Sequence, residues 1–189
     1  MTLIVDQHPL CKKFDWSSII KPDDNVEAIR IIKEIIESGN YFTNSPPFQT
    51  KENVFQRPEE VWMKFRMSFL MSCFLYLGRE VKVTGMKAWS FMTNLNTVED
   101  RDRYWHHHSK YGEGNGLSGI WYLKIPDDVK DRQTCGTEMA PNGPEGDGNF
   151  FLTPSDFHWM VYPSQIWHRP GIVQSNDWRF IIAVDMQYI

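Results

Sequence analysis

The sequence has little cysteine, and its cysteines lie far apart. Cys11, Cys73 and Cys135 are the three in 189 residues, and no two of them have the spacing of a CxxC motif. Disulfide frameworks and zinc knuckles both need cysteines that are paired or clustered. The sequence therefore excludes both kinds of small cross-linked domain and favours a reducing compartment.

Long hydrophobic runs and runs of basic residues are also missing. The longest apolar run, residues 67–77, is bounded by Arg66 and Arg79 and is too short for a membrane-spanning helix. Residues 1–13 lack the basic region of a secretory signal. The net charge is -4 and the sequence has no basic cluster, so it gives no sign of a positively charged surface that would bind nucleic acid or an anionic membrane. We therefore expect a cytoplasmic protein with neither nucleic acid nor membrane among its partners, while its oligomeric state stays open.

The first part of the chain has helical patterning. Apolar residues recur at helical spacing over 22–40, after the candidate caps Asp24 and Asn25 and before a stop at Gly39. A second apolar segment, 58–78, begins with a proline and two acidic residues and ends at a glycine. These patterns predict two helices, the second with a face broad enough to pack on a sheet.

From residue 81 onward the pattern becomes that of strands. Short β-branched and aromatic runs alternate with polar, Gly- or Pro-containing turns, at 81–95, 117–125, 157–163 and 178–186. We predict a mainly β fold, an antiparallel double-stranded β-helix (a cupin-like jelly roll) supported by the N-terminal helices. With no repeat or linker, we expect a single domain over 1–189, helical to about residue 80 and carrying its functional site from about 81 onward.

Three of the six histidines are consecutive, at residues 106–108. Side chains alternate along a strand, so His106 and His108 would share one face while His107 points to the other. Two imidazoles on one face can start a metal site, but a third ligand must come from elsewhere. His168 at the end of a predicted strand is the candidate we favour. A solvated or core-packed histidine cluster is the alternative.

The order of motifs after His106 resembles the prolyl-hydroxylase-like branch of the 2-oxoglutarate and Fe(II)-dependent oxygenases. That superfamily has an HxD pair, a GxG-type loop, a strand of the YYL type, a distal His and a final Arg. This sequence has, in the same order, His106 to His108, Gly112 to Gly114, the strand "LSGIWYL" at 117–123, His168 and Arg179. The resemblance covers roughly residues 85–189.

The resemblance implies a role for each matching residue. His106, His108 and His168 would bind Fe(II), leaving positions for 2-oxoglutarate and O2. Arg179 would pair with the far carboxylate of 2-oxoglutarate, aided by the Tyr122 hydroxyl, and Asn94 or Asn96 would contact its keto-acid end. The implied reaction is oxidation, chiefly hydroxylation, of a small-molecule or amino-acid-like substrate, with succinate and CO2 as co-products.

Two positions depart from the family pattern. Ser109 replaces a proline, which has little consequence, and His108 stands where most of the superfamily has an aspartate ligand. Three neutral histidines leave a metal site one unit more positive than two histidines and a carboxylate. We expect this charge to disfavour a high-valent metal state and to strengthen binding of an anionic cosubstrate.

A second resemblance, to the cupins, leaves an alternative open. The first cupin motif would add Glu113 to the three histidines as a metal ligand, and no 2-oxo acid would then be required. The second motif is imperfect, because Gln165 replaces its glycine and no asparagine follows His168 by three residues. A non-catalytic binding module on the same fold is a further alternative. Tryptophans near the site could flank a planar substrate, although we expect them to pack in the core.

Overall fold

The computed structural model describes residues 8–43, 48–97, 104–108 and 115–189. Within these residues the chain forms two helices, a short 3-10 turn at Val54–Gln56 and ten strands. The helices are α1 (Pro22–Glu37) and α2 (Glu60–Leu77). In the described ranges, no helix combines the length and the apolarity that crossing a bilayer requires.

Both predicted helices are present. α1 begins earlier than its predicted caps, because Pro22 occupies the first turn and Asp24 lies inside the helix, where its carboxylate accepts a bond from the Lys21 amide at 2.8 Å. α2 ends as predicted at Gly78, whose positive φ of 69° suits a residue without a side chain. Sequence patterning therefore located both helices, and only the start of α1 differed.

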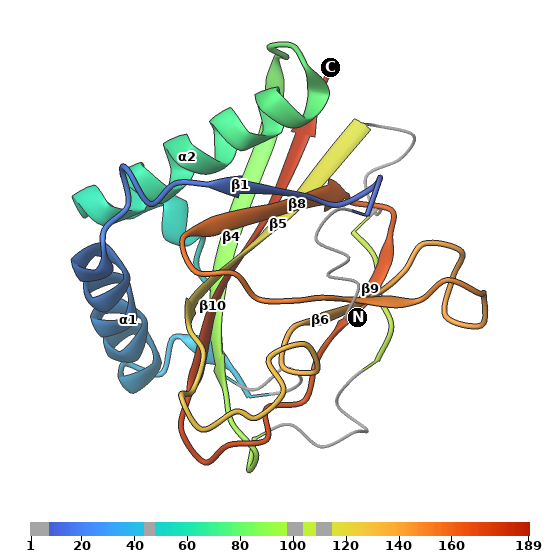
Figure 1. The fold of residues 1–189 in the computed structure, drawn as a ribbon. Helices are drawn as coiled ribbons and strands as arrows, with labels where there is room; N and C mark the ends of the chain where they lie inside the picture. The colour runs from blue at the N-terminus through green and yellow to red at the C-terminus, as the bar shows by residue number, and fades with distance from the viewer. Residues whose placement is uncertain (1–7, 44–47, 98–103, 109–114) are drawn as a thin grey trace.

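A large antiparallel sheet forms the centre of the molecule (Figure 1). It has seven strands in the order β1-β8-β5-β10-β4-β3-β2. The strands are β1 (Lys12–Asp15), β2 (Tyr41–Phe42), β3 (Gln49–Thr50), β4 (Val83–Thr93), β5 (Asn115–Lys124), β8 (His158–Pro163) and β10 (Arg179–Tyr188). A smaller antiparallel sheet has the order β7-β6-β9, with β6 (Thr137–Ala140), β7 (Phe150–Leu152) and β9 (Trp167–Pro170).

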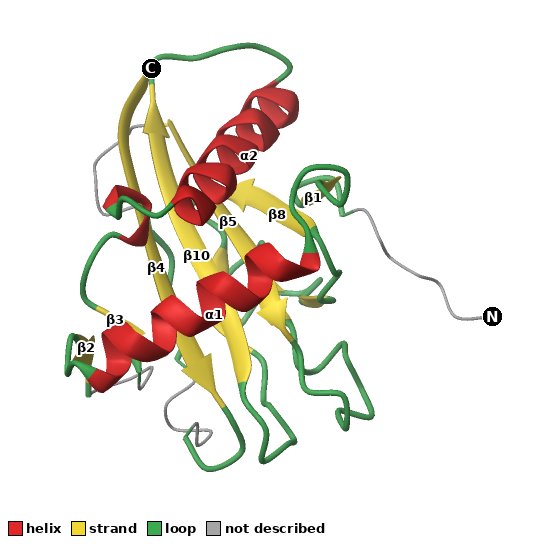
Figure 2. Ribbon diagram, turned by 90° about the vertical axis from the view of Figure 1, so that its left-hand side faces the viewer, coloured by secondary structure: helices red, strands yellow, loops and turns green. Residues whose placement is uncertain are grey.

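The large sheet has a different partner on each face. Both helices lie across one face (Figure 2), where Phe65 and Phe69 of α2 bury their rings against Trp121 and Trp159 of the sheet. The small sheet covers the other face, and a second apolar cluster lies between the two sheets. The predicted packing of the second helix on a sheet is confirmed.

Strand alternation decides which side chains face the small sheet. Along β10, Ile182 and Val184 belong to the cluster under the helices, whereas Ile181 belongs to the cluster between the sheets. Asp185 and Ser118 are cross-strand partners, and both line the cavity between the sheets. Alternation along the two strands therefore places a carboxylate and a hydroxyl side by side in the lining of this cavity.

Candidate metal centre

The consecutive histidines lie beside β9 at the open edge of the small sheet. His106 and His168 form an antiparallel bridge, with the His106 amide 3.1 Å from the His168 carbonyl and the reverse bond at 2.8 Å. The His108 amide donates to the Ser164 carbonyl at 2.9 Å. Backbone pairing thus brings a segment near residue 106 next to a histidine more than 60 positions later.

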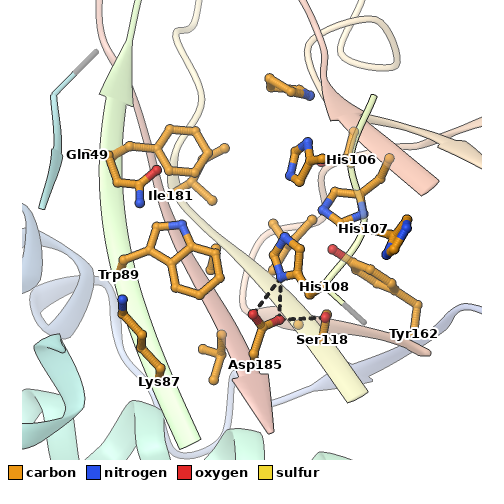
Figure 3. Close-up of a pocket in the computed structure, with 18 of the residues that line it drawn as sticks. Gln49, Lys87, Trp89, His106, His107, His108, Ser118, Tyr162, Ile181 and Asp185 are labelled. Atoms are coloured by element: carbon orange, nitrogen blue, oxygen red, sulfur yellow. Dashed lines mark hydrogen bonds and ion pairs between the residues drawn. The ribbon is translucent and has the colours of Figure 1, made fainter. Parts of the chain in front are cut away.

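The side chains of His106, His108 and His168 converge. One ring nitrogen of each lies within 4.8 Å of the others. Figure 3 shows His106 and His108 at the cavity wall. The His107 ring instead packs edge-on against Trp167, with ring centroids 4.4 Å apart. The structure therefore brings together the three histidines that the sequence singled out and leaves His107 outside their cluster.

Each converging histidine has its Nδ1 atom next to an acceptor. His106 Nδ1 lies 3.2 Å from the Tyr104 carbonyl and His168 Nδ1 lies 2.9 Å from the Ile166 carbonyl. His108 Nδ1 lies 2.6 Å from each carboxylate oxygen of Asp185. Because these partners only accept, Nδ1 is the donor in each contact, and Nε2 is the ring atom left to bind a metal. Outer hydrogen bonds of this kind orient histidines as metal ligands.

The electrostatics of the cluster favour neutral imidazoles. Burial lowers the pKa of His168 well below its ordinary value, and the neighbouring histidines lower it further. Burial is also the main reason why the pKa of His106 is lowered, with a further contribution from His108. Neutral rings bind metal ions and protonated rings do not. At neutral pH these two rings are therefore ready to act as ligands.

Asp185 is the residue of this site that sequence reasoning missed. Its carboxylate bonds His108, and it also accepts a hydrogen bond of 2.6 Å from the Ser118 hydroxyl (Figure 3). The Ser118 oxygen lies 3.0 Å from the Ser164 hydroxyl. The sequence offered one signal for this residue: Asp185 is the single acid of the mostly apolar strand sequence 179–186, and it is an even number of positions from Ile181, so both side chains face the same side.

Arg179 and Tyr122 of the large sheet are buried against β6 and the residues just before it. Arg179 is fully buried, and its guanidinium donates to the Thr93 hydroxyl at 3.2 Å, to the Gly171 carbonyl at 3.2 Å and to the Cys135 carbonyl. The Tyr122 hydroxyl lies 2.9 Å from that of Thr137. Burial raises the pKa of Tyr122 to about 12, and the nearby charge of Arg179 partly opposes this rise. Of these residues, only Thr137 lines the cavity.

The remaining predicted site residues lie elsewhere. The Asn94 amide donates to the Asn176 carbonyl at 3.1 Å, and the Asn96 amide lies 3.3 Å from the Asn176 side chain. Neither asparagine lines the cavity, so a contact with a cosubstrate stays a prediction for both. Ser109 and the segment from Gly112 to Gly114, including the alternative ligand Glu113, lie outside the described residues.

The three histidines line one side of a cavity of about 810 Å³ between the two sheets. The rest of its lining is mostly apolar and includes Trp89, Phe91, Ile120 and Ile181. A cavity of this size, with a few polar groups converging on one wall, is typical of a small-molecule site. The arrangement can hold a metal ion with ligands on one side only, facing space for further molecules.

Comparisons with known proteins show similarity in structure alone. No protein-family model matches the sequence, and no curated protein is significantly similar to it. A prolyl hydroxylase from Trichoplax adhaerens, solved with a peptide of hypoxia inducible factor, superposes with a TM-score of 0.65 at 14% identity, covering 95% of this chain and 83% of that one. The viral collagen prolyl hydroxylase of Paramecium Bursaria Chlorella virus-1, a 2-oxoglutarate complex, gives 0.59 at 12% identity and covers 98% and 99%.

A third similar structure is the epimerase SnoN in complex with Fe3+, α-ketoglutarate and nogalamycin RO. Its TM-score is 0.67 at 8% identity, with 95% of this chain and 79% of that chain covered. At such low identities the similarity establishes the fold and nothing finer. The predicted fold class is therefore confirmed: this chain has the double-stranded β-helix fold of the 2-oxoglutarate-dependent oxygenases.

Proposed function

We propose that this protein is a non-haem Fe(II)- and 2-oxoglutarate-dependent dioxygenase. One observation carries the proposal: three histidines, each with its Nδ1 bonded to an acceptor, converge at the wall of a cavity between the two sheets. Two of the three similar structures named above contain 2-oxoglutarate, and one of those also contains iron. The oxygenase motif order in the sequence points the same way.

The histidine cluster fits an iron ion. Neutral imidazole is a good ligand for Fe(II), and three ligands on one side leave positions open toward the cavity. His106, His108 and His168 would hold the metal through Nε2. When bound, the iron would supply the oxygen-activating chemistry. The protein orients the ligands: Asp185 holds the His108 ring in place, and backbone carbonyls hold the other two.

The cosubstrate would extend from the metal toward Arg179. A guanidinium matches a carboxylate with two parallel hydrogen bonds, and such a pair is strongest away from water. Arg179 is fully buried, and Tyr122 keeps its proton at neutral pH and can donate a further hydrogen bond. Thr137, which bonds Tyr122 and lines the cavity, lies between these groups and the open space. The products would be succinate, CO2 and an oxidised small-molecule or amino-acid-like substrate.

The test is a titration of 2-oxoglutarate into the anaerobic Fe(II) protein. A 2-oxo acid that chelates ferrous iron produces a weak visible charge-transfer band, and we expect this band in the wild-type protein. Arg179→Leu should keep its iron and bind 2-oxoglutarate at least tenfold more weakly, since it loses a charge-assisted pair worth about 1.5–3 kcal/mol. Absence of the band from the wild-type protein would refute the proposal.

A cupin-type metal enzyme that uses no 2-oxo acid is the second candidate. Two observations favour it. The cluster has a third histidine where the oxygenase pattern has a carboxylate ligand, and Arg179 is not among the residues that line the cavity. The same titration separates the two candidates, because a cupin-type site would bind iron and show no band with 2-oxoglutarate. Arg179→Leu would then alter only stability.

A further inference from the structure

The wall of the cavity formed by β4 carries a lysine that the proposed reaction does not use. Lys87, Trp89 and Phe91 all line the cavity, because alternate residues of a strand face the same side. Figure 3 shows Lys87 and Trp89 side by side on this wall, with Gln49 beyond them. Lys87 is the one lysine or arginine among the described residues that line the cavity.

The carboxylate nearest to Lys87 in the sheet is already engaged. Asp185 is the cross-strand partner of Lys87 on β10. Both Asp185 oxygens, however, lie 2.6 Å from His108, and one also accepts from Ser118. Within the described ranges, no carboxylate oxygen lies within 4 Å of the Lys87 ammonium. Lys87 is exposed and belongs to the cavity lining, so its ammonium is a donor group at the solvent-accessible side of the cavity whose neighbouring acid serves another residue.

Flat apolar surface lies next to this cation. Trp89 is half-buried and lines the cavity, with its ring centroid 5.4 Å from that of His108. Its cross-strand partner on β10 is Ala183, whose small side chain leaves room beside the indole. Phe42 lines the same region and is 43% exposed. Aromatic walls of this kind bind planar apolar groups by stacking and by burial of area.

Two amide side chains complete the polar part of the wall. Gln49 and Gln187 line the cavity, and no hydrogen bond of either side chain to another described residue is present. Gln187 lies over Gly85, where an added Cβ would come within 3.3 Å of its Oε1 atom. The wall thus combines one cation, two available amides and an aromatic surface a short distance from the histidines.

We infer that the primary substrate is a small carboxylic acid with a planar apolar body. Its carboxylate would pair with Lys87 and its ring would lie against Trp89, whose indole is the aromatic group next to His108. This inference deepens the proposed function and rests on it for the oxidation step. Recognition of the acid depends only on Lys87, Trp89 and their neighbours, so it can be tested separately.

Saturation-transfer NMR measures this recognition without any metal. The probes are phenylacetate, 3-phenylpropionate and indole-3-acetate, each paired with its primary amide, which has the same shape and no charge. We expect at least one acid to bind the wild-type protein at least tenfold more tightly than its amide. Lys87→Arg should keep this preference and Lys87→Met should abolish it. Lys130→Met removes an exposed lysine that does not line the cavity and should behave as wild type.

Three results would overturn the inference. The first is equal or absent binding of acid and amide in all three pairs. The second is an acid preference that persists in Lys87→Met. The third is competitive displacement of the acid by 2-oxoglutarate, which would assign Lys87 to the cosubstrate. Failure of the proposed function would show elsewhere, as a missing iron and 2-oxoglutarate band in a protein that still prefers the acid.

Discussion

Replacing Asp185 by asparagine tests how the protein orients His108, one of the three proposed metal ligands. Asparagine has nearly the same shape, and its carbonyl oxygen can still accept the Nδ1 proton, so the substitution removes charge and little else. The bond to the carboxylate is short, 2.6 Å, and the two side chains are 16% and 29% exposed. Hydrogen bonds to charged groups contribute about 1.5–3 kcal/mol and neutral ones about 0.5–1.5 kcal/mol.

The difference between those two ranges is about 1–1.5 kcal/mol, or roughly a tenfold loss of metal affinity. Asp185→Ala removes the acceptor altogether and should lose up to about 100-fold, the upper end for a group that supports a metal ligand. Competition of Co(II) between the protein and a chromophoric chelator measures both values. Asp177→Asn, at an exposed acid paired with Lys124, is the matched control and should change nothing.

Two outcomes would refute this reasoning. Wild-type affinity in both Asp185 variants would mean that the carboxylate does not support the ligand. A loss of more than about 1,000-fold in Asp185→Asn would exceed the range for an outer hydrogen bond and would make Asp185 a direct ligand.

Two further predictions concern packing and the ligand set. Gly119→Ala would place a methyl group inside the Phe69 ring, so it should lower the free energy of unfolding in urea by about 1–3 kcal/mol. Adding Phe69→Leu to the same chain should recover part of that loss. If the losses of stability of the two single variants simply add in the double variant, the clash is contradicted. His108→Asp sets a second carboxylate near Asp185, and like charges at short range repel. This variant should therefore bind iron more weakly than His108→Asp combined with Asp185→Asn, and the reverse order in an iron-binding titration would be evidence against the assigned contact.

Local patterning predicted those parts of the fold that depend on neighbours in sequence. The helical period and Gly78 located α2, and strand alternation separated His106 and His108 from His107. The start of α1 was misplaced because proline in the first turn competes with acidic residues as a start signal, and Pro22 occupies that position.

The features of the site that could not be predicted from the sequence depend on how distant strands pair. The contact between His108 and Asp185 spans 77 positions and follows from where β10 pairs with β5. Similarly, Lys87 and Trp89 can be recognised as candidate substrate-binding residues only when β4 is known to form a wall of the cavity. A single sequence contains the period of each strand and does not contain the pairing between distant strands.

Iron content of four alanine variants tests the central claim most directly. The protein is loaded with Fe(II) without oxygen, desalted and analysed for iron per chain. We predict about one iron per chain in the wild-type protein and in His107→Ala, and a large loss in His106→Ala, His108→Ala and His168→Ala, because each removes one of three converging nitrogens. Loss of iron from His107→Ala, or full retention in the other three variants, would contradict the proposed metal centre.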